Sequence, residues 1–450
     1  MIETKNPADG SLLKTYEEHT ETQLDSMLRK SDETFNSWKR YGIQERTKLL
    51  QNVADILESR KRYFAELMTR EMGKPISQSV AEVEKCIWVC EFYSVNGEQF
   101  LADELIATDA KESFISYDPL GCILGIMPWN YPFWQVMRFA APTLTAGNTI
   151  LLKHATNVTG CAFALQELFE EAGYPEGCFQ TIVTGHDKIE KLIASDLLKA
   201  ITLTGSENAG KAVAATAASH LKKAVLELGG NNSCMVWEDA DLDKYIDVMV
   251  KARMQNNGQS CIAAKRFIVV DSIYDEFLTK FEKAVSNLNR EEATHEKAYI
   301  TTLATTDIAD TVEKQVRDSV KKGARVLVGN KREHTYFEPT ILTEVVKGMP
   351  VFDEEVFGPV AAVTRAKDRD DAIAMAAHSR FGLGTMVFTE DITAARKVIG
   401  AIPDGSFFIN EMVKSDPRLP FGGTKASGYG RELSREGMME FVNKKTVYIK

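Results

Sequence analysis

Three polar side chains, each beside a turn, have the chemistry needed to act on a carbonyl group. The first, Cys261, follows the small polar loop 256–260 and precedes a β-like run at 266–270. A thiol is a useful nucleophile only as the thiolate, so this position would need help in lowering its pKa. A lone cysteine is also a common small core residue, and Cys261 alone therefore does not establish a nucleophile.

Two other stretches supply a base and a hydrogen-bond donor. Glu227 ends the apolar strand 224–226 and precedes a Gly-Gly turn. Burial disfavours the charged carboxylate, so its pKa should rise, as a general base requires. Asn130 lies in a rigid turn between Pro128 and Pro132, which makes its amide a candidate oxyanion donor. Each also has an ordinary interpretation: a glutamate bound by local N–H groups, and a turn asparagine.

Together, in the chain order Asn130, Glu227, Cys261, these motifs resemble the aldehyde dehydrogenase superfamily over nearly the whole chain. The resemblance implies that the Cys261 thiolate adds to an aldehyde and that the Asn130 amide and the Cys261 N–H stabilise the oxyanion. Hydride then passes to a nicotinamide, and Glu227 activates the water that hydrolyses the thioester to a carboxylic acid. The alternatives are a thiol hydrolase or transferase with a Cys–His pair, a CoA-acylating relative, a catalytically inactive relative and an aldehyde dehydrogenase of broader specificity.

The elements that must position these residues follow two alternating sets of strands and helices, at 132–226 and 241–425. Such alternation predicts an α/β fold with parallel sheets covered on both faces. We predict a Rossmann-like cofactor-binding domain, an α/β catalytic domain and a small β flap for oligomerisation. Their predicted bounds are 1–104 and 120–226 with 426–435 for the cofactor domain, 227–425 for the catalytic domain, and 105–119 with 436–450 for the flap. The terminal strand at 445–449 is expected to be free to pair between subunits.

Dinucleotides bind at the carboxyl ends of parallel strands, with phosphates at helix N-termini. No G-x-G-x-x-G follows a strand here; Thr204-Gly205-Ser206, with Gly210, takes its place and resembles the cofactor loop of the superfamily. The resemblance implies these cofactor contacts: Trp129, Lys153, Thr156, Gly185, Gly205, Ser206, Leu228, Glu355 and Phe357. Many NAD-preferring relatives carry a glutamate three residues after the lysine, where this chain has Thr156. We therefore expect NADP to be accepted, with NAD also used.

The substrate prediction rests on Arg138, eight residues after the oxyanion asparagine on a helix expected to line the aldehyde tunnel. Relatives acting on apolar aldehydes tend to place an aromatic there, whereas succinate-semialdehyde dehydrogenases place arginine. A guanidinium binds a carboxylate through two charge-assisted hydrogen bonds. By the same resemblance Trp134 and Ser415 join it, and the predicted reaction is succinate semialdehyde to succinate. The alternative is a surface arginine, and the second arginine of many such enzymes is replaced here by Gln255.

Bulk properties limit the remaining classes of function. A chain of 450 residues suggests about three domains, and a net charge of −10 argues against nucleic acid or an anionic membrane as partner. Seven scattered cysteines without CxxC fit reduced thiols, and no apolar run approaches the ~20 residues that cross a bilayer. The histidines show no ligand spacing, so no metal is expected. We expect a cytoplasmic homodimer or homotetramer acting on a small aldehyde, with an uncertain path at 290–306, where the family's usual Gly-Asp-Pro turn is missing.

Overall fold

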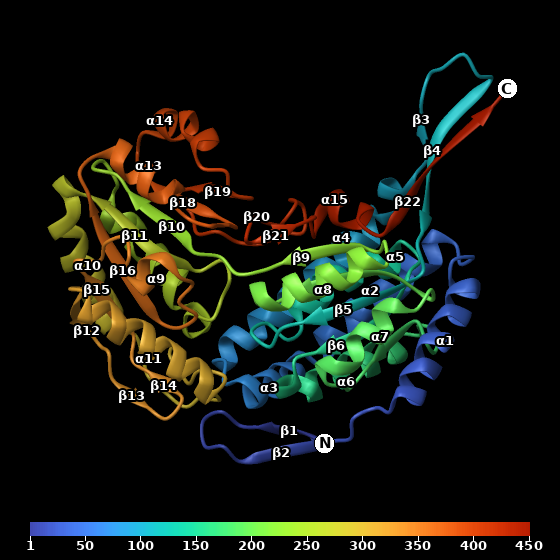
Figure 1. The fold of residues 1–450 in the computed structure, drawn as a ribbon, viewed down its shortest axis with the longest axis horizontal. Helices are drawn as coiled ribbons and strands as arrows, with labels where there is room; N and C mark the ends of the chain where they lie inside the picture. The colour runs from blue at the N-terminus through green and yellow to red at the C-terminus, as the bar shows by residue number, and fades with distance from the viewer.

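Two mainly parallel sheets, one in each lobe, and a projecting flap make up the molecule (Figure 1). The computed structural model describes residues 1–450. An N-terminal hairpin, β1 (Ile2–Lys5) and β2 (Leu12–Tyr16), lies across the bottom of the molecule in Figure 1. None of the helices combines the length and the apolar character needed to cross a membrane.

The first lobe contains a six-stranded sheet of order β21-β9-β8-β5-β6-β7, parallel except for the short β21. Its strands are β5 (Cys122–Met127), β6 (Thr149–His154), β7 (Phe179–Thr181), β8 (Leu198–Thr204), β9 (Lys223–Glu227) and β21 (Gly428–Tyr429). Alternate side chains enter different cores, because successive strand residues point to opposite faces: Ile150 and Leu152 pack on one face and Leu151 on the other.

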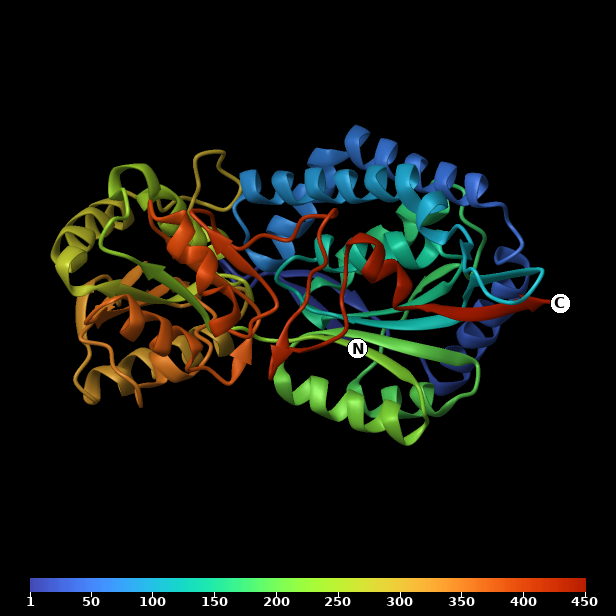
Figure 2. The same cartoon turned by 90° about the horizontal axis from the view of Figure 1, so that it is seen from above.

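Helices cover both faces of this sheet, as predicted. On the Ile150 side lie α2 (Ile43–Ser59), α3 (Lys61–Met72), α4 (Ile76–Leu101), α5 (Trp134–Thr145) and α6 (Thr159–Glu171). On the Leu151 side lie α1 (Glu21–Trp38), α7 (Ile189–Ala194) and α8 (Glu207–Ser219). Seen from above, α4 runs along the first lobe towards the second (Figure 2).

The second lobe contains a seven-stranded sheet of order β12-β15-β16-β11-β10-β18-β19, in which only β12 is antiparallel to its neighbour. Its strands are β10 (Asn232–Val236), β11 (Ala264–Val270), β12 (Arg325–Val328), β15 (Thr340–Thr343), β16 (Val360–Ala366), β18 (Thr385–Phe388) and β19 (Phe407–Ile409). The helices around it are α9 (Leu242–Met254), α10 (Tyr274–Ser286), α11 (Thr306–Lys321), α12 (Pro350–Asp353), α13 (Arg369–Ala377) and α14 (Ile392–Lys397). A small hairpin, β13 (Arg332–Glu333) with β14 (Tyr336–Phe337), lies outside the sheet. This second α/β unit completes the predicted fold class.

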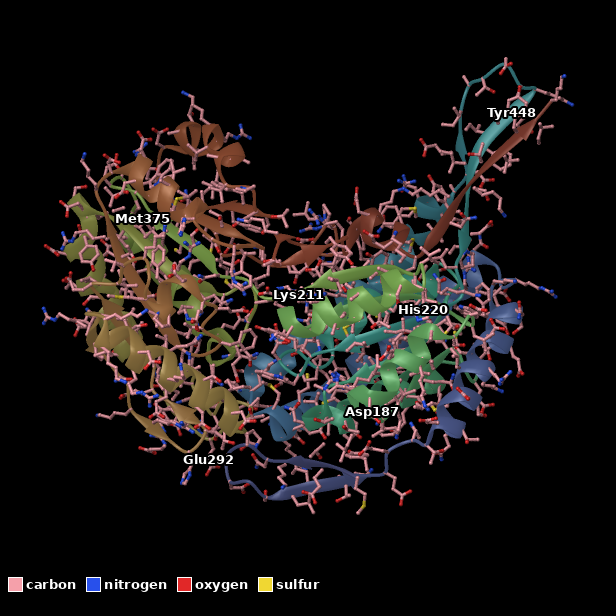
Figure 3. All side chains as sticks on the ribbon, viewed as in Figure 1. Asp187, Lys211, His220, Glu292, Met375 and Tyr448 are labelled. Carbon is pink, nitrogen blue, oxygen red and sulfur yellow. The ribbon has the colours of Figure 1, made fainter.

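The flap is a three-stranded antiparallel sheet that projects from the first lobe, with Tyr448 near its tip (Figures 1 and 3). It consists of β3 (Glu104–Leu105), β4 (Glu112–Pro119) and β22 (Val442–Ile449). The terminal strand β22 pairs with β4 along its whole length within the chain, and its other edge stays open. Helix α15 (Ser434–Met439) precedes this strand.

The chain passes between the lobes at two places that lie close together. Strand β9 of the first lobe ends at Glu227 and leads directly into β10 of the second. On the return, β20 (Thr424–Lys425) pairs with β17 (Phe381–Gly382) in the second lobe, and β21 then joins β9. The end of β9 lies between the two lobes (Figure 1), and Glu227 is the last residue of this strand.

Candidate active site

Two cavities meet at Cys261. One, of about 200 Å³, lies mainly against α4 and α5, and we call it the α4–α5 cavity. The other, of about 290 Å³, lies at the ends of strands β5, β8 and β9, and we call it the strand-end cavity. Cys261 and Gln135 line both. Asn130 and Glu227 also line the strand-end cavity, so the three side chains singled out as catalytic face one space.

The loop that carries Cys261 has an unusual backbone that its sequence suits. Asn256 and Asn257 both have φ of 53°, and Gly258 has φ of +73°. Asparagine and glycine are the residues that adopt this left-handed conformation most readily. A Cβ on Gly258 would lie 2.3 Å from the Gly358 carbonyl oxygen, so only glycine fits there. The polar loop recognised in the sequence is thus a tight turn that places Cys261 before β11.

Side chains from three other segments fix this loop. The Cys261 carbonyl accepts from Asn232 Nδ2 at 2.6 Å and from Lys265 Nζ at 2.7 Å. Asn257 exchanges hydrogen bonds with Thr301, whose N–H donates to Asn257 Oδ1 at 2.8 Å. Residues 287–305 contain no helix or strand, and this segment braces loop 256–260, which we call the catalytic loop because it carries the predicted nucleophile.

The Cys261 thiol is protonated in the ligand-free protein. Burial raises its pKa to about 11, although the positive charges of Arg138 and Lys265 act in the opposite direction. The two cations therefore lower the pKa of the thiol, as a nucleophilic cysteine requires, but desolvation raises this pKa by more. Formation of the thiolate requires a base that accepts the thiol proton.

Glu227 has the properties of such a base. Burial raises the pKa of its carboxyl group well above the usual value, and the nearby Glu432 raises it further. This confirms the predicted direction. Neither carboxyl oxygen has a hydrogen-bond partner within the protein, which rules out a glutamate held by local N–H groups. A buried, unpaired carboxyl group with a raised pKa suits proton transfer near neutral pH.

Asn130 is oriented by the catalytic loop. Its Nδ2 donates to the Gln259 main-chain carbonyl oxygen at 3.1 Å, and the main-chain carbonyl of Asn130 accepts from Asn256 Nδ2 at 2.8 Å. The amide is therefore more than an ordinary turn asparagine, because it is buried and tied to the segment that ends at Cys261. One amide hydrogen remains for an oxyanion in the strand-end cavity.

The strand-end cavity has the features of a dinucleotide site. Ser206 caps α8, its hydroxyl accepting from the Ala209 N–H at 3.3 Å, and the other first-turn N–H groups of this helix suit a phosphate. A Cβ added to Gly205 would contact only the Leu203 side chain, so a ligand can approach the backbone closely there. Six of the predicted cofactor contacts line this cavity: Trp129, Gly205, Ser206, Leu228, Glu355 and Phe357.

Three of these side chains have specific contacts within the protein. The Glu355 carboxylate accepts from the Gly230 N–H and from Lys265 Nζ, both at 3.1 Å. The Trp129 and Phe357 rings pack edge to face with centroids 5.6 Å apart. Because Lys265 also binds the Cys261 carbonyl, it joins the catalytic loop to a predicted cofactor contact.

The other three predicted cofactor contacts lie at neighbouring positions along the same sheet edge. Lys153 is buried near the end of β6, and desolvation lowers its pKa. Thr156 is exposed and opens the short 3-10 helix η1 (Thr156–Val158), whereas Gly185 precedes η2 (His186–Lys188). None of the three lines the strand-end cavity. An extended dinucleotide that follows the carboxyl ends of the strands would pass all of them.

The α4–α5 cavity contains the three predicted substrate residues, Arg138, Trp134 and Ser415. Arg138 is only 2 % exposed, which excludes a surface arginine. It is not wholly free, however. Its Nε forms an ion pair with the buried Glu432, and its Nη2 donates to Thr204 Oγ1 at 3.3 Å. Part of the guanidinium expected to bind a carboxylate is thus already occupied.

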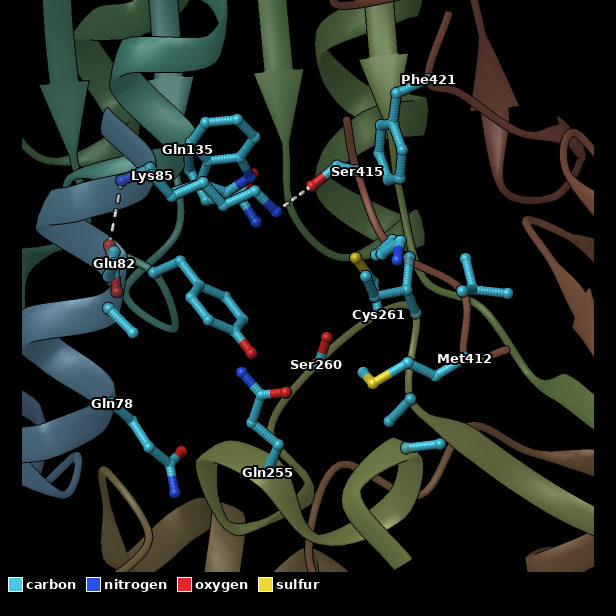
Figure 4. A pocket seen from close by; sticks show the side chains of 18 of the residues that line it. Gln78, Glu82, Lys85, Gln135, Gln255, Ser260, Cys261, Met412, Ser415 and Phe421 are labelled. Atoms are coloured by element: carbon cyan, nitrogen blue, oxygen red, sulfur yellow. Dashed lines mark hydrogen bonds between the residues drawn. The ribbon is translucent and has the colours of Figure 1, made fainter. Parts of the chain in front are cut away.

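Lys85, Lys265 and Glu432 are site residues that the sequence did not reveal. Lys85 Nζ donates to Ser415 Oγ at 2.7 Å across the α4–α5 cavity (Figure 4). Lys265 lies four residues after Cys261, and Glu432 lies in the glycine-dense return segment, but no motif connects any of the three to the site. No histidine lines either cavity, so no residue of this type is placed to activate the Cys261 thiol. This removes the support for a Cys–His hydrolase.

Comparisons with known proteins agree with this geometry. The pattern of the aldehyde dehydrogenase family matches residues 1–447. A probable succinate-semialdehyde dehydrogenase [NADP(+)] of Synechocystis sp. is 49 % identical, covering 100 % of this chain and 99 % of the relative. Succinate-semialdehyde dehydrogenase [NADP(+)] 1 of Mycobacterium tuberculosis is 43 % identical over the same shares.

Two solved structures share the fold of this chain. The succinic semialdehyde dehydrogenase of Streptococcus pyogenes, in complex with NADP+ as the cofactor, superposes with a TM-score of 0.97 at 33 % identity, covering 100 % of both chains. An NADP-dependent enzyme of E. coli superposes with a TM-score of 0.97 at 32 % identity, covering 100 % of this chain and 94 % of the other. The fold, the site and these similarities show that the chain belongs to the aldehyde dehydrogenase family.

Proposed function

We propose that this aldehyde dehydrogenase oxidises succinate semialdehyde to succinate, with NADP or NAD as hydride acceptor. The observation that carries the proposal is the position of Cys261, which opens on one side to a strand-end dinucleotide site and on the other to a cavity lined by cations. The names of the relatives from Synechocystis and Mycobacterium support the same substrate.

The residues divide the chemistry in a defined order. A base takes the Cys261 thiol proton, and the sulfur forms a bond to the aldehyde carbon while the carbonyl oxygen becomes an oxyanion beside the Asn130 amide. The nicotinamide cofactor, when bound in the strand-end cavity, supplies the hydride acceptor that allows the adduct to become a thioester. Glu227 then takes a proton from water, the water oxygen attacks the thioester carbon, and the C–S bond breaks to release the acid and the Cys261 thiolate.

NADP is the cofactor that we propose as the better one. Thr156 is uncharged and exposed, so it does not repel a 2′-phosphate, and its hydroxyl can donate a hydrogen bond. Two curated relatives carry NADP(+) in their names, and the Streptococcus structure has NADP+ as its cofactor.

The flap suggests how copies of the chain associate. Its outer strand β22 has one paired edge, towards β4, and one open edge, and the sheet stands clear of the first lobe (Figure 1). An open strand edge is a natural site for pairing with another chain. We propose a homodimer or homotetramer, which light scattering after size-exclusion chromatography would measure; a monomer at micromolar concentration would contradict it. Cytoplasmic location likewise remains a prediction from the seven cysteines, all of which are free thiols.

A kinetic panel tests the proposed activity. Succinate semialdehyde, a longer ω-carboxylated aldehyde and butanal are each oxidised with NADP and with NAD, in the presence and absence of CoA. We expect the highest kcat/KM for succinate semialdehyde with NADP, and no requirement for CoA. A highest value for butanal would favour an aldehyde dehydrogenase of broader specificity, and a requirement for CoA would favour the acylating reaction.

A further inference from the structure

We propose that Lys85 is a specificity-determining residue, whose ammonium group binds the carboxylate of the substrate in the α4–α5 cavity. This inference rests on the proposed function and extends it, because Lys85 belongs to no motif of the sequence. Its support comes from three properties of the cavity: the place of the ammonium group, the balance of charge around it, and the donors that remain unused.

Lys85 spans the cavity. Its side chain starts from α4 on one wall of the cavity. Its Nζ lies 4.3 Å from the centroid of the Trp134 ring and donates a hydrogen bond to Ser415 Oγ on the opposite wall. Figure 4 shows this bridge and the Cys261 sulfur facing the same space. A ligand with an aldehyde at one end and an anion at the other can therefore contact Cys261 and Lys85 together.

The acidic and basic groups that line the cavity are otherwise matched. Glu82 forms an ion pair with the buried Lys74, and its Oε1 also accepts from the N–H groups of Phe133 and Trp134, each at 2.9 Å. Arg138 is paired with Glu432, as described above. Neither the Glu82 nor the Glu432 carboxylate is therefore left to neutralise a further cation.

Of the cations that line the cavity, Lys85 is the one that is partly buried and has no carboxylate partner. Lys414 pairs with Glu411 at 2.9 Å, and Lys251 is exposed to solvent. The hydrogen bond of Lys85 goes to a hydroxyl group, which carries no charge. Burial and the neighbouring charge of Arg138 lower the pKa of Lys85 to about 8, so the protonated amine is held at a cost that an incoming carboxylate would offset.

The unused donors suit a carboxylate. An ammonium group has three N–H bonds, of which Ser415 takes one. When a carboxylate oxygen binds Nζ, the Ser415 hydroxyl hydrogen is available for the second oxygen. Gln255, at the position where many succinate-semialdehyde dehydrogenases have a second arginine, lines the same cavity. Lys85 thus supplies from α4 a positive charge that is missing at position 255.

The test compares Lys85→Met, which keeps the length and apolar stem, with Lys85→Arg, which keeps the charge. For Lys85→Met we expect kcat/KM for succinate semialdehyde to fall roughly 30-fold or more, as for a lost buried charge contact, with butanal within about threefold of wild type. Lys85→Arg should retain most of the activity on succinate semialdehyde. Lys314 lies on the exposed face of α11, so Lys314→Met is a matched loss of a lysine. It should leave kcat/KM unchanged for both substrates.

Each outcome decides the proposal. Equal losses on both substrates, or an unchanged value for succinate semialdehyde, would overturn the role of Lys85 while leaving the wild-type preference, and so the proposed function, intact. A wild-type enzyme that prefers a longer ω-carboxylated aldehyde would overturn the proposed substrate but not Lys85, if Lys85→Met loses that activity. A wild-type enzyme without preference for carboxylated aldehydes would overturn both. If Lys85→Met unfolds, as judged by circular dichroism, Lys85→Gln takes its place.

Discussion

The strand-end cavity and the α4–α5 cavity share Cys261 but are built in different ways. The strand-end cavity is formed largely by residues that directly follow the strands β5, β8 and β9 of one sheet. The α4–α5 cavity is formed by side chains from helices and loops far apart in the chain, such as Lys85 and Ser415, which are 330 positions apart. The topology of the sheet thus determines the lining of the strand-end cavity, where the cofactor is proposed to bind. Tertiary packing of distant segments determines the lining of the α4–α5 cavity, where the substrate is proposed to bind.

This difference separates the chemistry common to the family from the choice of substrate. Residues at strand ends keep their places as long as the sheet forms, so the cofactor side is determined by the fold. The charges of the α4–α5 cavity depend on individual pairings, such as Arg138 with Glu432. A single substitution there can change the acceptable aldehyde without disturbing the sheet.

The largest effect is expected where the two cavities meet. We predict, as a hypothesis, that Cys261→Ala abolishes dehydrogenase activity and leaves cofactor binding largely intact, because the alanine removes the nucleophile but not the strand ends. Steady-state turnover and a fluorescence titration with NADPH would measure the two properties. Turnover near that of wild type would show that another group attacks the aldehyde.

Glu227→Gln should separate the two halves of the reaction. The amide cannot accept a proton, so we expect steady-state turnover to fall by roughly 10²–10⁴-fold, the range for a lost general base. If another group deprotonates the thiol, a rapid-mixing experiment will show a burst of reduced cofactor followed by slow hydrolysis. Equal slowing of the burst and of the steady state would instead mean that Glu227 also serves as the base for Cys261.

Arg138→Ala tests whether this arginine belongs to the substrate cavity alone. We expect kcat/KM to fall for succinate semialdehyde by roughly 2–5 kcal/mol, and to fall for butanal as well, because Glu432 is left buried without its partner close to Glu227. The free energy of unfolding should drop by roughly 3–5 kcal/mol, as for a broken buried pair. A loss confined to succinate semialdehyde, with unchanged stability, would restore the simpler view of Arg138 as a dedicated carboxylate ligand.

On the cofactor side, Thr156→Glu should shift preference towards NAD. A carboxylate at this exposed position would repel a 2′-phosphate and accept a hydrogen bond from a 2′-hydroxyl. We expect the ratio of kcat/KM for NAD to that for NADP to rise roughly tenfold, equivalent to about 1.4 kcal/mol. An unchanged ratio would place the selection elsewhere, for example at Lys153.

The smallest predicted effect is a pH dependence of substrate choice. Lys85, with its pKa lowered to about 8, is charged below that pH and increasingly neutral above it. The charged groups around it are Glu82 on α4, Arg138 on α5 and Asp416, whose own pKa is lowered by Arg418. The ratio of kcat/KM for succinate semialdehyde to that for butanal should therefore fall several-fold between pH 7 and pH 9, roughly as one ionisation predicts.

The ratio cancels the ionisation of Cys261 and Glu227, which both substrates share. Lys85→Met should show a ratio that is low and independent of pH across this range. A falling ratio that persists in Lys85→Met would assign the titration to another group.

The fold was largely predictable because its signals are local. The alternation of strands and helices expected at 132–226 is found in β6, α6, β7, α7, β8, α8 and β9, because local apolar patterns and turn residues determine these elements. The flap was predicted less well: pairing of β22 with β4 is a long-range contact that leaves no local pattern. The division into domains remains a prediction, which the two separate sheets support.

The site was predictable only in part, for the same reason. Asn130, Glu227 and Cys261 each lie in a motif, and the structure brings them to one cavity. Lys85 lies in the middle of an amphipathic helix, where a lysine usually faces solvent, and nothing in its neighbourhood indicates Ser415 as a partner. The pairing of Arg138 with Glu432 joins two segments whose contact is created by the fold itself.

The raised pKa of Cys261 has a consequence for the durability of the enzyme. Peroxides and alkylating agents attack the thiolate rather than the thiol, so a cysteine whose pKa is about 11 is nearly inert towards them at neutral pH. We expect inactivation of the ligand-free protein by iodoacetamide to be slow at pH 7 and to accelerate steadily up to pH 10. Such protection comes from the desolvation of a sulfur that is only partly exposed where the two cavities meet, and it would be lost in any variant that hydrates the sulfur further.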